Sequence, residues 1–282
     1  MKGCICLDID GTITSNPHEV PCAVVKFFHE LHEKGWVFLF ITGRLYSFAH
    51  AALRDMHFPY FFAVQNGADL LLMPEKKLLS REYLPFSCVP KLEELCMTMS
   101  EDFLLYSGWE KGDFCYYRPK KFSPSMLEYL EIVQSVSHKS WRALESFSFV
   151  AEETFPLIKL LGTKEEMFRM HNVLQQAEIG EVSCVKDPLS PNVGYLNLLT
   201  AKNVNKGKIL EKMRSYFPKG TLFIAAGDDY NDLSMLQEAD CAIAMANAPS
   251  TLLAQANIIA NSAQENGIIQ ALQEATQEKI SL

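Results

Sequence analysis

Apolar and polar positions alternate in blocks along the first quarter of the chain. Short, continuously apolar runs end at turn signals, as buried strands do, and segments with apolar side chains at helical spacing separate them. In the first such segment an apolar stripe runs from Val24 to Leu31, and Gly35 marks its end. The pattern predicts strands over residues 3–7, 36–41 and 61–64 and helices over residues 21–34 and 45–56. This β-α-β-α-β order favours a parallel sheet with helices on both faces.

The same alternation returns after about residue 200. It predicts strands over residues 222–226, 242–244 and 258–260 and helices over residues 205–216, 229–238, 250–255 and 267–276. We therefore expect a doubly wound, mainly parallel α/β sheet of the Rossmann-like kind, assembled from both ends of the chain.

Between these two parts, over about residues 83–190, the pattern of apolar and polar residues is different. Helical patterns over residues 90–99, 124–136 and 164–176 are separated by short aromatic or β-branched runs over residues 103–106, 114–117, 155–161 and 182–185. This mixture predicts an inserted α+β cap domain with an open sheet. Proline-containing, turn-like strings near residues 83–85 and 187–192 mark its limits. We thus expect a discontinuous core domain over residues 1–82 and 190–282 and a cap domain over residues 83–189.

Composition excludes several classes of function. The 282 residues carry a formal net charge of −8 and no long run of Lys and Arg, so we expect neither nucleic acid nor a membrane as a partner. Asp8 and Asp10 interrupt the N-terminal apolar run before it reaches the length of a secretory signal. The 8 cysteines are scattered without a C-x-x-C pair, which is typical of buried thiols in a reducing compartment. We expect a cytoplasmic protein that is a monomer or a weak dimer.

Two acidic strings follow predicted strands that lie far apart in the sequence. Asp8 and Asp10 come directly after the first strand, and residues 227–232, Gly-Asp-Asp-Tyr-Asn-Asp, follow the strand that ends at Ala226. Acid pairs are poor core material, because burying an unpaired charge is costly. Ligands of doubly wound sheets bind outside the carboxyl ends of the strands, so the two strings indicate one site.

Two more strings fall at the same edge or at the start of a helix. Thr42, Gly43 and Arg44 follow the second strand, and Lys206 stands at a helix start. Clustered carboxylates repel one another unless a cation neutralises them, and Mg²⁺ suits an all-oxygen site that includes a substrate phosphate. A carboxylate can attack phosphorus to form an aspartyl-phosphate, while a hydroxyl, backbone N–H groups and a lysine hold the phosphoryl oxygens. The set is therefore complete for phosphoryl transfer.

These strings resemble the haloacid dehalogenase superfamily of phosphatases, and most closely its Cof-type branch (subclass IIB), whose large cap follows the third core strand. The family's D-x-D-G-T motif is matched by residues 8–12, its second-motif Thr by Thr42, its lysine by Lys206 in the phrase V-N-K-G, and its G-D-x-x-N-D motif by residues 227–232. The phrases Asn66-Gly67-Ala68 and Met245-Ala246-Asn247-Ala248 are also Cof-like, although the family usually has Gly where Ala246 stands. The resemblance covers both core segments, and the cap matches in size and position.

The resemblance implies catalytic and metal-binding roles for the matched acids. Asp8 is expected to be the nucleophile, and Asp10 the general acid for the leaving group and then the base for the attacking water. The expected metal shell comprises the Asp8 carboxylate, the backbone carbonyl of Asp10, and Asp228. Asp232 is expected to contact metal-bound waters from the second layer.

The resemblance also implies a phosphate cradle made of Thr42, Gly43 and Lys206, with Asn231 as a further candidate. Arg44 is a candidate contact to the cap or to the leaving group of the substrate. In the cap, substrate choice is expected to depend on charged and aromatic side chains, the candidates being Arg118, Lys120, Lys121, Arg142, Lys159, Tyr116, Tyr117 and Trp141.

The function that fits best is that of a Mg²⁺-dependent phosphatase acting on small phosphorylated metabolites, sugar phosphates first, through an aspartyl-phosphate intermediate. A phosphohexomutase of the same architecture is one alternative, and a non-catalytic small-molecule-binding module is another. The second alternative predicts damage to at least one catalytic position. Instead, every one is present: Asp8, Asp10, Thr42, Lys206 and Asp228.

Overall fold

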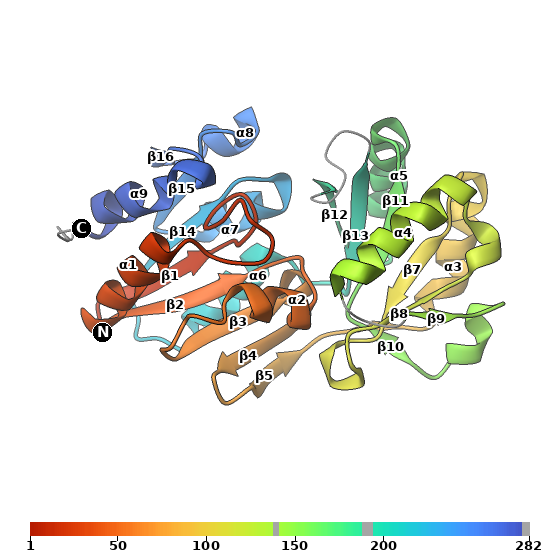
Figure 1. The fold of residues 1–282 in the computed structure, drawn as a ribbon, viewed down its shortest axis with the longest axis horizontal. Coiled ribbons are helices and arrows are strands. Elements are labelled where there is room, and N and C mark those ends of the chain that lie inside the picture. The colour runs from red at the N-terminus through yellow and green to blue at the C-terminus, as the bar shows by residue number, and fades with distance from the viewer. Residues whose placement is uncertain (138–140, 188–193, 278–282) are drawn as a thin grey trace. The chain divides into compact units, whose positions relative to one another are not determined.

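The chain divides into two compact units in a computed structural model that describes residues 1–137, 141–187 and 194–277. The first unit comprises Met1–Arg44, Phe48–Arg81 and Asn205–Leu282, and the second comprises Leu45–Ser47 and Glu82–Val204. Each unit contains a sheet covered by helices, as the sequence predicts (Figure 1).

Eight strands of the described chain form the sheet of the first unit, in the order β16-β15-β14-β1-β2-β3-β4-β5. They are β1 (Gly3–Leu7), β2 (Trp36–Ile41), β3 (Tyr60–Val64), β4 (Asp69–Met73), β5 (Lys77–Arg81), β14 (Leu222–Gly227), β15 (Cys241–Met245) and β16 (Ile258–Ala260). All neighbours pair in parallel except at β3–β4 and β4–β5, which are antiparallel. The mainly parallel sheet is thereby confirmed.

Strand β1 lies in the middle of this sheet, between β14 and β2. All five of its residues are buried, because helices cover both faces of the sheet and leave no polar face. Its carboxyl end is therefore flanked by the carboxyl ends of β14 and β2, since all three strands run in the same direction. This is the edge at which the sequence predicts a site.

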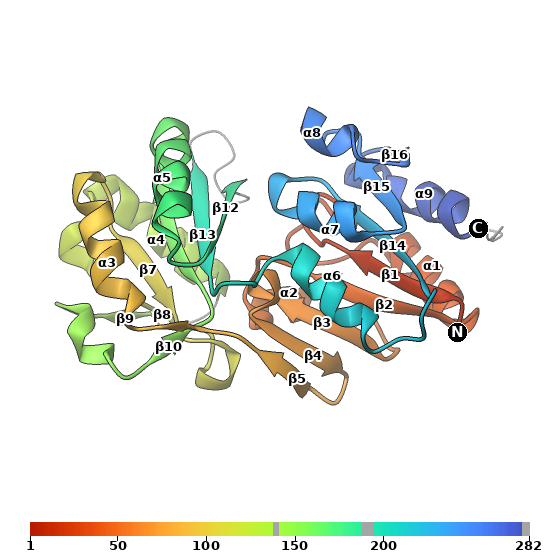
Figure 2. The same cartoon turned by 180° about the vertical axis from the view of Figure 1, so that it is seen from behind.

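Helices α1 (Cys22–Glu33) and α9 (Gly267–Thr276) cover one face of the sheet. There, Phe28 of α1 packs on Phe38 of β2 with ring centroids 5.0 Å apart. Helices α6 (Lys206–Arg214), α7 (Leu233–Glu238) and α8 (Ser250–Leu253) bury apolar side chains against the other face. Figures 1 and 2 show these two helical layers from opposite sides. Helix α2 (Tyr46–Ala52) connects β2 to β3.

A six-stranded, mostly antiparallel sheet forms the second unit, in the order β12-β13-β11-β7-β8-β9. Its strands are β7 (Phe103–Tyr106), β8 (Cys115–Tyr117), β9 (Arg142–Ala143), β11 (Ile158–Gly162), β12 (Glu181–Lys186) and β13 (Tyr195–Thr200). Helices α3 (Cys88–Leu95) and α5 (Lys164–Ala177) pack on one face, and α4 (Pro124–Ser137) packs on the other. A separate short pair joins β6 (Leu84–Pro85) to β10 (Thr154–Phe155). The α+β character expected of the insert is found.

The second boundary between the units differs from the expected one. The sequence places the change near residue 190, whereas residues up to Val204 cluster with the second unit. The reason is β13, which pairs with both β11 and β12 and so completes the second sheet. Residues 188–192 of the turn-like string that suggested the earlier boundary lie outside the described residues.

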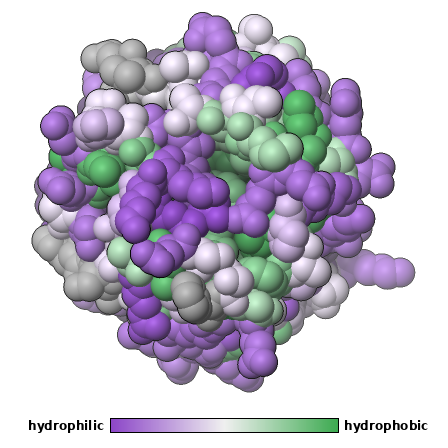
Figure 3. Space-filling model, turned by 90° about the vertical axis from the view of Figure 1, so that its right-hand side faces the viewer, coloured by the Kyte–Doolittle hydropathy of each residue, from purple (hydrophilic) through white to green (hydrophobic). Residues whose placement is uncertain are grey.

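The surface carries polar and apolar side chains together. On the face shown in Figure 3, hydrophilic side chains separate the hydrophobic patches from one another. No helix among the described residues is both long enough and apolar enough to cross a membrane.

Candidate active site

The turn after β1 is built around a glycine. Gly11 has a φ of +72°, a left-handed conformation that glycine adopts without strain, and its N–H donates to the carbonyl of Thr14 at 2.9 Å. A Cβ atom at this position would lie 2.1 Å from a carboxylate oxygen of Asp228. The Gly in D-x-D-G-T therefore lets the loop after β1 approach the loop after β14 closely.

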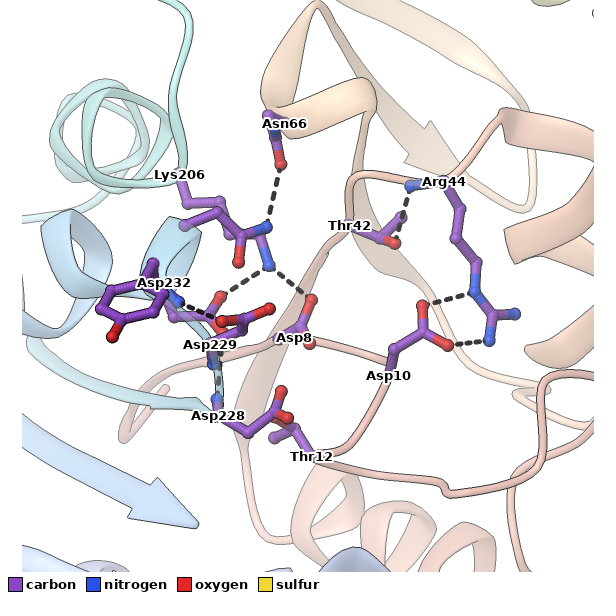
Figure 4. Close-up of polar contacts among 12 residues, drawn as sticks. Asp8, Asp10, Thr12, Thr42, Arg44, Asn66, Lys206, Asp228, Asp229 and Asp232 are labelled. Atoms are coloured by element: carbon purple, nitrogen blue, oxygen red, sulfur yellow. Dashed lines mark hydrogen bonds and ion pairs between the residues drawn. The ribbon is translucent and has the colours of Figure 1, made fainter. Parts of the chain in front are cut away.

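Asp8, the first residue after β1, is 5% exposed and faces Lys206. Its Oδ1 atom accepts a hydrogen bond from Lys206 Nζ at 2.5 Å, and the same Nζ donates to Asp232 Oδ1 at 2.6 Å (Figure 4). The three charged side chains come from the residue after β1, the start of α6 and the turn after β14. The acidic strings predicted to form one site are thus brought together.

Lys206 stands at the beginning of α6, where Asn205 caps the helix by accepting the N–H of Lys208 at 2.9 Å. The lysine side chain is 1% exposed, so it crosses the interior to reach the two carboxylates. Burial alone would lower the pKa of Lys206, but Asp232 and Asp8 outweigh it and raise the pKa above its ordinary value. Lys206 is therefore a fixed cation.

Asp232 organises the loop that follows β14. Its Oδ2 atom accepts the backbone N–H groups of Asp228 and Asp229, each at 3.0 Å, while its Oδ1 atom holds Lys206. The short helical turn Tyr230–Asp232 that carries it is closed by a reciprocal cap with Asp229. Asp232 thus fixes both the loop backbone that presents Asp228 and the lysine that contacts Asp8.

Each carboxyl group of the site makes the ionised form of its neighbours less stable. Burial, with the charges of Asp232 and Asp10, raises the pKa of Asp8 to about 8 even though Lys206 opposes the shift. Burial, with the charges of Asp8 and Asp232 next in size, raises the pKa of Asp228 to about 9. One lysine does not balance these acids, so the site has a deficit of positive charge.

A divalent cation fits that deficit. One carboxylate oxygen from each of Asp8, Asp228 and Asp232 lies within 4.8 Å of the others, an all-oxygen donor set of the type that Mg²⁺ prefers. The expected metal shell named Asp8 and Asp228, which lie in this cluster, and the backbone carbonyl of Asp10. The residues present therefore suit the ion that the sequence suggests.

Asp10 turns its carboxylate away from this cluster and toward Arg44. Its Oδ2 atom accepts Arg44 Nε at 2.6 Å, and its Oδ1 atom accepts the second arm of the guanidinium group (Figure 4). Arg44 also donates to the carbonyl of Pro17 at 2.7 Å and lies over the ring of Phe48. Arg44 was expected to contact the cap or the substrate. In this structure it instead donates hydrogen bonds to Asp10, the expected acid–base residue.

Thr42 and Asn231, both expected to belong to a phosphate cradle, follow the two strands that flank β1. Thr42 is 1% exposed, and its Oγ1 atom accepts the backbone N–H of Arg44 at 3.0 Å. Asn231 belongs to the turn after β14, and its Nδ2 atom donates to Asn66 Oδ1 at 3.3 Å. Gly43 lies between Thr42 and Arg44 in the loop after β2. Their contacts with phosphate remain predictions.

Two residues of the site had no role assigned from the sequence. Thr12 Oγ1 donates to Asp228 Oδ1 at 3.4 Å, and Asn66 contacts Asn231. Thr12 is the last residue of the first motif, and Asn66 begins the quoted phrase Asn66-Gly67-Ala68. The motifs therefore marked both positions, but only the folded chain shows which groups they contact.

Several of the charged side chains proposed for the second unit are held by other protein groups. Arg118 is 4% exposed and forms a two-pronged ion pair with Asp102, at 2.7 and 2.8 Å. Lys120 pairs with Glu145 at 3.0 Å. The Arg142 guanidinium lies 3.9 Å from the centroid of the Phe114 ring. The Arg118 pair is buried, whereas the pair of Lys120 with Glu145 lies at the surface.

A family model described as haloacid dehalogenase-like hydrolase matches residues 5–272. A protein of Haemophilus influenzae provisionally named a phosphatase is 24% identical over 272 residues, which is 95% of each chain.

Solved structures share the fold of the whole chain. A haloacid dehalogenase-like hydrolase from Bacteroides thetaiotaomicron has a TM-score of 0.74 at 22% identity, covering 98% of this chain and 100% of that one. A sugar phosphatase of subclass IIB has a TM-score of 0.75 at 20% identity, covering 97% of this chain and 98% of that one. The expected architecture, a Rossmann-like core with an inserted cap, is therefore confirmed.

Proposed function

The chain belongs to the haloacid dehalogenase-like hydrolases, and on this premise we propose that it is a Mg²⁺-dependent phosphatase that hydrolyses small phosphorylated metabolites. Sugar phosphates are the first class of substrate to test, since a fold neighbour is a sugar phosphatase. The observation that carries the proposal is the buried triad of Asp8, Lys206 and Asp232 with Asp228 beside it. It joins a carboxylate nucleophile, a fixed cation and a set of metal ligands in one site.

The first half of the proposed reaction transfers the phosphoryl group to Asp8. One oxygen of Asp8 attacks phosphorus, the ester P–O bond breaks, and an aspartyl-phosphate forms. Lys206 holds the Asp8 carboxylate in place and offsets charge on the phosphoryl oxygens. Asp8, Asp228 and the backbone carbonyl of Asp10 would hold a Mg²⁺ ion, which would supply the remaining positive charge.

Asp10 handles the protons in both halves. It donates a proton to the departing alkoxide, and then takes a proton from the water that attacks the aspartyl-phosphate and releases inorganic phosphate. Both of its carboxylate oxygens accept N–H groups of Arg44 in this structure. The proton is therefore carried by a carboxyl group that Arg44 holds through both oxygens, each of which keeps a second lone pair.

The remaining residues bind the phosphoryl oxygens. In this proposal the donors are the Thr42 hydroxyl and the Gly43 N–H in the loop after β2, and the Asn231 amide in the turn after β14. Donors fixed before the reaction stabilise charge that develops in the transition state, at little cost in reorganisation. We also propose that the protein is cytoplasmic, in keeping with its eight free cysteines, and that it acts as a monomer or weak dimer.

The test is phosphate release from a panel of sugar, nucleotide and cofactor phosphates with Mg²⁺ present. Asp8→Asn removes the nucleophile without changing its size, so we expect turnover to fall by at least about a thousandfold while the fold is retained. Asp55→Asn, which changes an exposed acid of the same unit, serves as the matched control and should keep full activity.

Two outcomes contradict this proposal. Substantial hydrolysis by the Asp8→Asn variant excludes Asp8 as the nucleophile. Conversion of a hexose 1-phosphate to its 6-phosphate, with no release of inorganic phosphate, identifies a mutase instead.

A further inference from the structure

The turn that follows β3, Gln65–Gly67, touches three elements of the proposed phosphate cradle. From these contacts we propose that Asn66 is a positioning residue, which fixes the Asn231 amide and the loop after β2 in the geometry that binds a phosphoryl group. The inference deepens the proposed function and rests on it. Asn66 acts through its neighbours and not on the reacting atoms. We therefore expect its loss to weaken phosphate binding more than it slows the breaking of the ester bond.

The backbone of this turn is held to the loop after β2. The Asn66 N–H donates to the carbonyl of Thr42 at 2.8 Å, and the Gln65 N–H donates to the carbonyl of Arg44 at 3.1 Å. Gln65 and Asn66 have φ values of +52° and +57°, in the left-handed region that asparagine tolerates better than most residues. The unusual backbone is what lets both N–H groups face the Thr42–Arg44 loop.

The Asn66 side chain adds a second connection. It is 2% exposed, and its Oδ1 atom accepts the Asn231 Nδ2 group at 3.3 Å. Figure 4 shows the Asn66 side chain pointing toward the side of the site where Lys206 lies. An amide presents donors on one side and an acceptor on the other, so a fixed acceptor at Asn66 sets the way in which Asn231 faces.

Gly67 connects the same turn to the helix that begins with Lys206. A Cβ atom on Gly67 would lie 2.1 Å from Cγ1 of Ile209 in α6, so the absence of a side chain allows close packing. The turn thereby contacts the Thr42 loop, the Asn231 turn and the Lys206 helix. One short turn therefore contacts all three segments that carry the groups expected to hold the phosphate.

Asn66→Gly isolates the side chain, because glycine keeps the left-handed backbone and the N–H donated to Thr42. We expect the inhibition constant for inorganic phosphate and the KM for a phosphate ester to rise about fivefold, the value of one lost hydrogen bond, while kcat changes less than about twofold. Asn203→Gly is the matched control, since Asn203 is an exposed asparagine with a φ of +66°. It should leave both constants unchanged.

A double-mutant cycle with Asn231→Ala separates positioning from a general structural role. If Asn66 acts through Asn231, the Asn66→Gly/Asn231→Ala variant binds inorganic phosphate no more weakly than Asn231→Ala alone. Additive losses, or an Asn66→Gly variant with the phosphate affinity of the wild type, overturn the inference. Calorimetric binding of inorganic phosphate to the wild type distinguishes the two proposals, because a wild type that neither binds nor releases phosphate refutes the proposed function as well.

Discussion

Lys206 is the residue on which the charge balance of the site depends. It is the cation shared by Asp8 and Asp232, at 2.5 and 2.6 Å, and all three side chains are buried. Removing one partner of a buried ion pair leaves charge that neither water nor a counter-ion stabilises, which costs more than the pair itself contributes. The lysine is therefore expected to matter for folding as well as for phosphate binding.

We predict that Lys206→Met lowers the free energy of unfolding by about 3 kcal/mol, because Asp8 and Asp232 lose their cation. Lys208→Met removes an exposed lysine two residues further along α6, whose ion pair with Glu211 lies at the surface, and should cost less than about 1 kcal/mol. Urea unfolding followed by circular dichroism measures both variants. Equal stability of the two would show that the buried triad does not contribute as argued.

Among the elements, the continuously apolar strands have predicted bounds that agree better with the structure than the predicted ends of the helices do. The runs at β1 and β2 were predicted to the residue, because continuous burial produces continuous apolar sequence. The helix predicted over residues 229–238 is instead a short turn, Tyr230–Asp232, followed by α7, because Asp232 bonds back to the N–H groups of its own loop. A capping contact of this kind does not change the spacing of apolar residues, so the sequence pattern does not reveal where the helix begins.

Strand β13 was not predicted, since Asn197 interrupts its apolar pattern. Asn197 is buried, and its Nδ2 atom donates to the carbonyl of Met167 in α5 at 2.8 Å. The sequence does not reveal that a helix 30 residues away supplies the acceptor. The antiparallel strands β4 and β5 were also missed, and β5 lies at the edge of the sheet with a partly polar sequence.

The site was predictable as far as strand ends determine it. Asp8 and the string 227–232 each follow an apolar run, and neighbouring parallel strands then bring them together. The contact between Asn66 and Asn231, 165 residues apart, depends on the conformation of two turns. The pairing of Asp10 with Arg44 likewise depends on side-chain geometry that spacing does not encode.

Strand β11 of the second unit contains a charged residue, Lys159. Burial lowers the pKa of Lys159 below its ordinary value of 10.5, although Asp187 and Cys115 oppose the shift, and the Tyr106 ring lies 5.3 Å from its Nζ atom. The native state therefore releases this proton at a lower pH than the unfolded chain does. Between the two pKa values the unfolded chain binds more protons, so the free energy of unfolding contributed by Lys159 rises with pH.

We predict that Lys159→Met raises the free energy of unfolding near neutral pH, because it removes the cost of burying the charge. The gain over the wild type should shrink as the pH rises toward the ordinary pKa of lysine, because the native side chain of the wild type, whose pKa is lowered, loses its charge first. Urea titrations at about pH 7 and about pH 10 test this, with the exposed Lys164→Met as control. A gain that is independent of pH would exclude the charge as its cause.

At the scale of the whole molecule, every side chain of the proposed catalytic machinery belongs to the first unit. Asp8, Lys206 and Asp228 come from segments that enter this unit from both ends of the chain. The second unit has its own buried cores on both faces of its sheet. A ligand of the acidic cluster therefore stabilises the first unit directly.

This division predicts how Mg²⁺ changes thermal unfolding. An ion that binds only the native first unit adds about 2.7 kcal/mol at a hundredfold excess over its Kd, so scanning calorimetry should show a higher transition temperature with Mg²⁺ than with EDTA. If the units unfold in separate transitions, one transition should shift and the other should not. Asp228→Asn removes one carboxylate of the cluster and should abolish most of the shift, whereas Asp55→Asn should preserve it. An equal shift in Asp228→Asn would place the ion elsewhere, because a cation held by Asp8, Asp228 and Asp232 must respond to the loss of one of them.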